Sequence, residues 1–219
     1  MKIICISDTH TLHRKMKHPI PDGDVIVHTG DFMSSGWDKT QYIPFLTWFN
    51  SLPHKHKIFI AGNHDRFAEM YNEEFRNDVK SLDNVTYLQD NACEIEGVKF
   101  YGSPWTKHFH NWAFNMPEEN SRYEFFAENL WKKIPSDTNV LLTHGQPYKI
   151  NDKAPDGYDT GCKYLLERIK ELPALKLYVG GHIHCEHGVK EIDGVTFVNA
   201  AICNEEYEPV NAPIVYELN

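Results

Sequence analysis

The sequence predicts an α/β protein in which two mixed β-sheets pack face to face and helices cover their outer sides. Three observations lead to this fold class. Short apolar strand segments alternate with helical segments in the first half of the chain, which is typical of strands joined by helical crossovers. Later strand segments follow one another across tight turns, which indicates hairpins. No long linker or internal repeat divides the chain, so residues 1–219 are expected to form one domain.

The first half of the chain is expected to contain three buried strands and two helices. Lys2–Ile6, residues 24–28 and residues 57–61 are short, largely apolar runs, as expected for strands covered on both faces. Apolar residues recur at helical spacing across residues 42–52, which a proline follows. Residues 66 to about 82 are expected to form a second helix.

The second half is expected to be richer in strands. They are predicted at residues 85–88, 92–95, 98–102, 139–143, 175–179, 189–192, 196–198 and 214–217. One helix is predicted at residues 160–172, with Asp159 or Thr160 as its N-cap and Pro173 after its end.

Composition narrows the classes of function. The chain has 31 acidic and 22 basic residues, a formal net charge of −9, which argues against nonspecific binding of duplex nucleic acid. No apolar run approaches the roughly 18 residues of a membrane span, and no secretory signal is expected. Five widely spaced cysteines without a Cys-x-x-Cys motif favour reduced thiols and a cytoplasmic location. Thirteen histidines supply much imidazole, a common metal ligand.

Five predicted strands end in a small residue followed by Asp, Asn or His. The segments are Ser7-Asp8-Thr9-His10, Gly30-Asp31, Gly62-Asn63-His64-Asp65, Thr143-His144 and Gly180-Gly181-His182-Ile183-His184. Because the carboxyl ends of strands gather at one edge of an α/β sheet, these side chains are expected to share one cleft. The glycines before Asp31, Asn63 and His182 permit tight turns and close backbone approach.

This set of donors favours two divalent transition-metal ions over a single structural zinc ion. Structural zinc sites are closed and prefer thiolate ligands. Carboxylate, amide oxygen and imidazole ligands together suit transition metals, and one carboxylate can bridge two ions.

In order and spacing, the five segments resemble the calcineurin-like metallophosphoesterase superfamily. The resemblance rests on Asp8-x-His10, Gly30-Asp31, Gly62-Asn63-His64-Asp65, His144 and Gly181-His182-x-His184. It implies a four-layer metallophosphoesterase fold, two mixed sheets with flanking helices, and a phosphoester hydrolase with two metal ions.

The resemblance also implies a role for each residue. The ligands would be Asp8, His10 and His184 on the first ion, Asn63, His144 and His182 on the second, and Asp31 as the bridge. His64 would stabilise the transition state or protonate the leaving oxygen, and Asp65 would orient its imidazole. Mn²⁺ or Fe is the family expectation, with Zn²⁺, Co²⁺ and Ni²⁺ as alternatives. A hydroxide bridging the two ions would attack phosphorus in line with the leaving group.

A closer resemblance, over almost the whole chain, is to MPPED-type (metallophosphoesterase-domain-containing) proteins. It rests on residues 102–106, 112–114, 143–145, 195–200 and 209–211. Members of that branch are associated with phosphodiesterase activity, including on cyclic nucleotides. Gln146 is a departure, because the branch usually reads Gly-Pro-Pro after the histidine, and this bears on loop shape and substrate choice.

Residues 105–114 (WTKHFHNWAF) are the candidate substrate-binding segment. Trp105, His108 and Trp112 are the residues expected to contact substrate, with aromatic rings stacking on a base and cations meeting phosphate. The alternative is that Trp105 and Phe114 only pack beneath a loop.

Histidines outside the motifs are expected to have structural positions. His28 is predicted to be buried and hydrogen-bonded rather than a ligand. His13, His18, His54 and His56 are predicted to be solvated loop residues.

The leading hypothesis is a metal-dependent phosphodiesterase acting on a small nucleotide-type substrate, a cyclic nucleotide being one candidate. Protein-phosphatase relatives carry Asp-Arg-Gly after Gly-Asp to bind a monoester dianion, whereas Phe32-Met33-Ser34 follows Gly30-Asp31 here, which favours a diester. The alternatives are a phosphomonoesterase and a metal-loaded binding or scaffold protein with weak catalysis. The expected partner is a small phosphoester, not duplex nucleic acid or a membrane.

Overall fold

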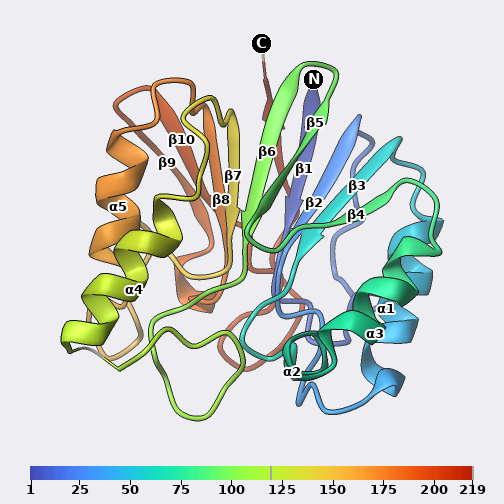
Figure 1. Ribbon diagram of the computed structural model, residues 1–219. Coiled ribbons are helices and arrows are strands. Elements are labelled where there is room, and N and C mark those ends of the chain that lie inside the picture. Colours follow the sequence, from blue (N-terminus) through green and yellow to red (C-terminus); the bar gives the residue numbers. More distant parts are fainter. Residues whose placement is uncertain (119, 219) are drawn as a thin grey trace.

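The computed structural model describes residues 1–118 and 120–218 and confirms the predicted α/β class. A five-stranded and a six-stranded sheet pack together, and helices cover the outer side of each, which makes four layers (Figure 1). Within the described ranges, no helix combines the length and the apolar character that a membrane crossing needs.

The first sheet is mixed, with strand order β11-β1-β2-β3-β4. Its parallel strands are β1 (Lys2–Ile6), β2 (Val25–Thr29), β3 (His56–Ile60) and β4 (Val85–Tyr87). Strand β11 (Ile214–Glu217) pairs antiparallel with β1. Each of these strands starts and ends within one residue of its predicted position.

The second sheet is also mixed, with strand order β5-β6-β7-β8-β10-β9. Its strands are β5 (Asn91–Ile95), β6 (Val98–Ser103), β7 (Val140–Thr143), β8 (Leu177–Gly180), β9 (Gly188–Ile192) and β10 (Val195–Asn199). Strands β6, β7, β8 and β10 are parallel, and the edge strands β5 and β9 are antiparallel to their neighbours.

The alternation of side chains along each strand builds a separate core on each face of the sheet. In β1, Ile3 and Cys5 lie in the core between the sheets, whereas Ile4 and Ile6 lie in the core beneath the helices. The sheets approach closely at Gly102, where a Cβ atom would lie 2.7 Å from Ile60 Cγ2.

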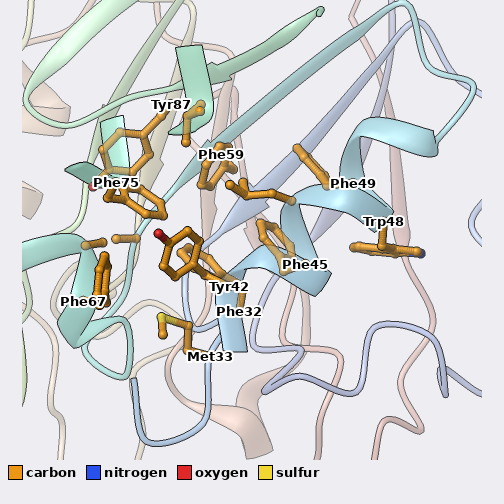
Figure 2. Packing of buried hydrophobic residues seen from close by; sticks show 14 of the residues in the cluster. Phe32, Met33, Tyr42, Phe45, Trp48, Phe49, Phe59, Phe67, Phe75 and Tyr87 are labelled. Carbon is orange, nitrogen blue, oxygen red and sulfur yellow. The ribbon is translucent and has the colours of Figure 1, made fainter. Parts of the chain in front are cut away.

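Helices α1 (Lys39–Ser51), α2 (Arg66–Met70) and α3 (Asn72–Lys80) lie on the first sheet's side of the molecule (Figure 1). Asp38 caps α1 by accepting the backbone N–H of Thr40 at 2.8 Å. Buried aromatic rings fill the space between α1, α3 and the sheet (Figure 2). Phe45 stacks on Phe32 with ring centroids 4.5 Å apart.

Two helix predictions need correction. The helix predicted from residue 66 to about 82 is divided at Tyr71, where the Asn72 side chain bonds the carbonyl oxygen of Ala68. Helix α5 (Lys163–Lys170) begins later than predicted and has Cys162 as its N-cap. Thr160 is not the cap, because its hydroxyl donates to the carbonyl oxygen of Asp152 instead.

Helix α4 (Ser121–Trp131), which the sequence analysis did not predict, covers the second sheet together with α5 (Figure 1). Its buried residues Tyr123, Ala127, Leu130 and Trp131 recur at helical spacing. Asn120 caps this helix by accepting the backbone N–H of Arg122.

The carboxyl ends of β1, β2, β3, β7 and β8 lie at the same edge of the two sheets, the lower edge in Figure 1. The segments that follow these strands are the five that carry the predicted site residues.

Candidate metal centre

Four of the predicted metal ligands have an unusual backbone conformation. The φ angles are 51°, 41°, 56° and 68° for Asp8, His10, Asp31 and His182. They lie in the left-handed region, which residues other than glycine rarely adopt. Backbone bonds hold the turns together, from Asp8 N–H to Gly30 O at 2.9 Å and from His10 N–H to Asp31 O at 3.0 Å. Strained backbone of this kind is concentrated at functional sites.

Two glycines at the ends of strands have no room for a side chain. A Cβ atom at Gly62 would overlap the carboxylate of Asp31, and one at Gly181 would overlap the carboxylate of Asp8. The glycines in these motifs are therefore required by the close approach of backbone to candidate ligands, as the sequence indicated.

Asp8, His10 and His184 form the first group of donor atoms. The Nε2 atoms of His10 and His184 are 3.2 Å apart, and His184 Nε2 is 3.4 Å from Asp8 Oδ1. Ligands about 2.1 Å from one metal ion, at tetrahedral or octahedral angles, lie roughly 3.0–3.4 Å apart. Both measured separations fall in this range, and the three donor atoms all lie within 4.8 Å of one another.

Asn63, His144, Asp31 and His182 form the second group. His144 Nε2 lies 2.9 Å from Asn63 Oδ1 and 3.2 Å from Asp31 Oδ2. The donor atoms of Asp31, His144 and His182 all lie within 4.8 Å of one another. Asp31 also belongs to a cluster with His10 and His64, so its carboxylate lies between the two groups.

Three of the candidate histidine ligands are oriented in the same way. The Nδ1 atoms of His10, His144 and His184 bond backbone carbonyl oxygens of Met33, Thr29 and Asn204, at 3.1, 2.8 and 2.9 Å. A carbonyl oxygen only accepts, so Nδ1 carries a proton, and in the neutral ring the lone pair of Nε2 faces the site. This arrangement is usual for histidine ligands to metals.

The charges in the site suit cation binding. Burial disfavours ionisation of Asp31, but His144 and His64 outweigh it and hold its pKa well below the usual range. Burial lowers the pKa of His10 and His182 to about 4, so both rings are neutral near pH 7. For His144, burial by itself would lower the pKa, but the charges of Asp31 and Asp8 outweigh this effect and raise the pKa to about 9. A metal ion would compete with the His144 proton.

Asp65 does not orient His64, which corrects the role expected for it. The buried carboxylate of Asp65 accepts three backbone N–H groups, those of Asp31 at 2.8 Å, Met33 at 2.9 Å and Gly62 at 2.7 Å. The Nδ1 of His64 instead bonds the carbonyl oxygen of Ser34. Asp65 therefore joins the segments that carry Asp31 and Asn63.

The structure separates the three predicted substrate contacts. Trp105 packs edge-on against Phe114 and Phe126, and its Nε1–H donates to Asp90 at 3.0 Å. His108 is exposed. Trp112 lies at the candidate metal centre, where its ring stacks on the imidazole of His64.

Two adjoining cavities open beside the donor groups. The first, here called the mouth, has a volume of about 270 Å³, and its lining includes Asp31, His64, Trp112 and Tyr207. The second, here called the apolar cavity, has about 340 Å³ and is lined by residues including Trp105, His108, Met116, Trp131, Cys162 and Leu165. Phe109, His182 and Ile183 line both.

Tyr207 is a site residue that the sequence analysis missed. Its ring centroid lies 4.8 Å from that of His10 and 5.2 Å from that of His184. It belongs to an acidic loop (NEEYE) without a motif, so nothing in the local sequence distinguished it. Glu205 of the same loop also lines the mouth.

Other histidine predictions have mixed outcomes. His28 is buried and bonds Thr9 Oγ1 at 2.9 Å, which confirms its structural position. His18 is exposed, as predicted. His13 and His54 were expected to be solvated, but both are buried, His13 against Trp48 and His54 through a bond to Pro21 O.

Comparisons with known proteins agree with the motifs. The profile described as Calcineurin-like phosphoesterase matches residues 1–186. The chain is 34% identical over 238 residues to Metallophosphoesterase domain-containing protein 1 of Homo sapiens, across 99% of this chain and 71% of that protein. It is 38% identical over 229 residues to UPF0046 protein K07C11.7 of Caenorhabditis elegans, across 99% and 74% of the two chains.

Solved structures share the fold. TT1561 of Thermus thermophilus has a TM-score of 0.59 at 15% identity, over 90% of this chain and 88% of that one. A second solved structure has a TM-score of 0.65 at 14% identity, over 90% and 89%. At these identities, the likeness concerns the fold alone.

Proposed function

The chain belongs to the calcineurin-like phosphoesterase family, and on this premise we propose that it is a metal-dependent phosphodiesterase with two divalent ions. The observation that carries the proposal is the convergence of carboxylate, amide and imidazole donor atoms into two groups that share Asp31. The donor types and their separations fit transition-metal ions.

We assign the ligands as the sequence predicted, with Asp8, His10 and His184 on one ion, Asn63, His144 and His182 on the other, and Asp31 on both. When bound, the ions would stabilise charge developing on the phosphoryl oxygens and acidify water at the centre. Mn²⁺ or Fe is the proposed native metal, and a single domain over residues 1–219 would carry the whole site.

His64 is the proposed proton donor to the leaving oxygen. Its Nδ1 is engaged by the carbonyl oxygen of Ser34, so Nε2 is the ring nitrogen left to act on substrate. The imidazole lines the mouth and is in ring contact with His10, with centroids 4.8 Å apart. A proton delivered from this place would offset the charge of the departing alkoxide.

The charge of the mouth supports a diester over a monoester. Within the described part of the chain, no lysine or arginine lines the mouth, and Glu205 adds a negative charge there. Phe32 and Met33, which follow Asp31, are fully buried in the hydrophobic core. A monoester dianion would therefore meet no lysine or arginine in the mouth, whereas a diester carries a single charge.

The apolar cavity supports a substrate with a flat, largely apolar organic group, as in a nucleotide. It adjoins the mouth through His182 and Ile183, so a group esterified to the phosphate could enter it. Trp105 and His108 are its proposed contacts, and a cyclic nucleotide remains one candidate substrate.

The five cysteines are all free thiols, which supports a reducing, cytoplasmic location.

The test compares hydrolysis of bis(4-nitrophenyl) phosphate and 4-nitrophenyl phosphate by protein loaded with Mn²⁺, after its bound Mn, Fe, Zn and Co have been measured. Preference for the diester supports the proposal, and preference for the monoester would establish the phosphomonoesterase alternative. Inactivity of fully metallated protein on both esters and on a panel of cyclic nucleotides would indicate a binding or scaffold protein. The variant His184→Ala is the control for contaminating hydrolases.

A further inference from the structure

The ring of Trp112 covers the imidazole of His64. Their centroids are 4.1 Å apart and their planes meet at 26°, which is a stacked arrangement. The guanidinium carbon of Arg66 lies 4.4 Å from the ring centroid of Trp112 and 4.4 Å from that of Trp37. Arg66 thus links two tryptophans, one of which contacts the proposed proton donor.

Hydrogen bonds hold Trp112 in this place from both sides. Arg66 Nη2 donates to the carbonyl oxygen of Asn111 at 2.8 Å, on the residue before Trp112. On the residue after it, the N–H of Ala113 donates to the carbonyl oxygen of Asn63 at 3.0 Å. The N–H of Phe114 donates to Glu69 Oε1 at 2.7 Å. The loop is therefore tied to the segment that carries His64.

His64 itself has few other restraints. Its imidazole is partly exposed and lies beside the rings of His10 and Tyr207, with centroids 4.8 and 6.3 Å away. Among the described residues, the ring makes one hydrogen bond, from Nδ1 to the carbonyl oxygen of Ser34. A ring with one hydrogen bond and edge-on or tilted neighbours can still tilt about that bond. Stacking on a broad indole restricts this motion and fixes where Nε2 points.

We propose that Trp112 is a positioning residue that holds the imidazole of His64 in line with the leaving oxygen, and that Arg66 holds Trp112. This inference rests on the proposed function, because it assigns Trp112 to the proton-transfer step of that reaction. It differs from the expectation that Trp112 stacks on a substrate base, in which case the ring would act on substrate binding and not through His64.

The dependence on leaving group distinguishes these roles. A 4-nitrophenolate leaves with little help from a proton donor, whereas phenolate or an alkoxide needs one. Four proteins are compared on bis(4-nitrophenyl) phosphate and on phenyl or nucleoside diesters: wild type, His64→Ala, Trp112→Ala and the double variant. Trp112→Phe and Arg66→Met are added, with Phe125→Ala, an exposed aromatic on α4, as the matched control.

A positioning role for Trp112 predicts that Trp112→Ala lowers kcat at least about tenfold on the phenyl and nucleoside diesters, whose leaving groups are poor. On the 4-nitrophenyl ester, kcat should fall less than about threefold, and KM should stay nearly constant on all of them. In the His64→Ala background, Trp112→Ala adds no further loss. Trp112→Phe retains most of the rate, Arg66→Met gives a partial loss, and Phe125→Ala has no effect.

Ring-current shifts give a readout that does not depend on activity. In metal-free protein, the His64 ring protons should resonate upfield of their position in Trp112→Ala. The proposal is overturned if these resonances coincide, if the losses in the double variant are multiplicative, or if Trp112→Ala raises only KM for nucleoside esters. By contrast, absence of diester hydrolysis by metallated wild type would overturn the proposed function itself.

Discussion

The carboxylate of Asp65 accepts the backbone N–H of Asp31 at 2.8 Å. Because the same carboxyl group also accepts the N–H groups of Met33 and Gly62, one buried side chain joins two loops of the candidate metal centre. Burial and the neighbouring Asp31 carboxylate raise the pKa of Asp65 well above its usual range, whereas the N–H groups of Met33 and Gly62 favour the ionised form, which only accepts hydrogen bonds.

Asp65→Asn should therefore destabilise the fold. An amide offers one acceptor oxygen and places its NH₂ group against backbone donors, so at least one buried N–H loses its partner. The free energy of unfolding in urea should fall by about 2–4 kcal/mol. Asp156→Asn, in an exposed loop, should change it by less than about 0.5 kcal/mol. Equal stability of Asp65→Asn and wild type would show that the three bonds contribute little.

His28 should make the metal-free protein sensitive to acid. Burial, partly offset by Asp8, lowers its pKa to about 3. A histidine in the unfolded chain has a pKa of about 6.5. Between these values the unfolded chain binds the extra proton, so stability falls as the pH falls from about 6.5 toward 3. Acidification from about pH 6.5 to 5 should cost roughly 1.5–2 kcal/mol through this residue.

The measurement is denaturant unfolding at both pH values in a chelating buffer, for wild type and His28→Gln. The variant can keep a hydrogen bond to Thr9 but cannot titrate. Between pH 6.5 and 5, the free energy of unfolding of the variant should fall by roughly 1.5–2 kcal/mol less than that of wild type. An identical pH dependence in both proteins would mean that His28 is protonated as easily in the folded state as in the unfolded one.

Glu205 should disfavour monoester binding, because its carboxylate lines the mouth beside the candidate metal ligands. Glu205→Gln should lower KM for 4-nitrophenyl phosphate about threefold and leave KM for the diester within about twofold, with the difference shrinking in high salt. Glu206→Gln is the matched control, since this neighbouring exposed carboxylate does not line the mouth. The same response in both variants would assign the effect to net charge alone.

Gly181→Ala should weaken metal binding without removing a ligand. The added Cβ would overlap the carboxylate of Asp8 and displace it from His184. Affinity for Zn²⁺ or Mn²⁺, measured by calorimetric titration, should fall about tenfold or more. Gly97→Ala, in an open turn remote from the site, should strain the backbone but leave metal affinity unchanged. Unaltered affinity in Gly181→Ala would refute the steric argument.

The strands and the gathering of candidate ligands were predictable, because both depend on short-range patterns. The sequences of buried strands are apolar runs, and parallel strands place the residues after their carboxyl ends at one edge of the sheet. This reasoning predicted that Asp8 would meet His184 and that Asn63 would meet His144, although each pair comes from distant parts of the chain.

The remaining features depend on contacts between distant segments that no local pattern encodes. Asp65 follows His64 directly, yet its carboxylate turns to backbone N–H groups of another loop. Trp112 meets His64 only because the loop folds back onto the segment after β3. Helix α4 was missed although its apolar spacing was present in the sequence.

The proposed function requires that the shared donor cluster around Asp31 bind the metal ions used to hydrolyse a phosphodiester. The most direct measurement titrates metal-free protein with Mn²⁺ while hydrolysis of bis(4-nitrophenyl) phosphate is followed, for wild type and Asp31→Asn. Wild-type activity should rise until two ions are bound per chain. Asp31→Asn should bind metal weakly and remain at least about a hundredfold less active. Hydrolysis that persists in chelator, or an Asp31→Asn variant with wild-type rate and stoichiometry, would contradict the proposed function.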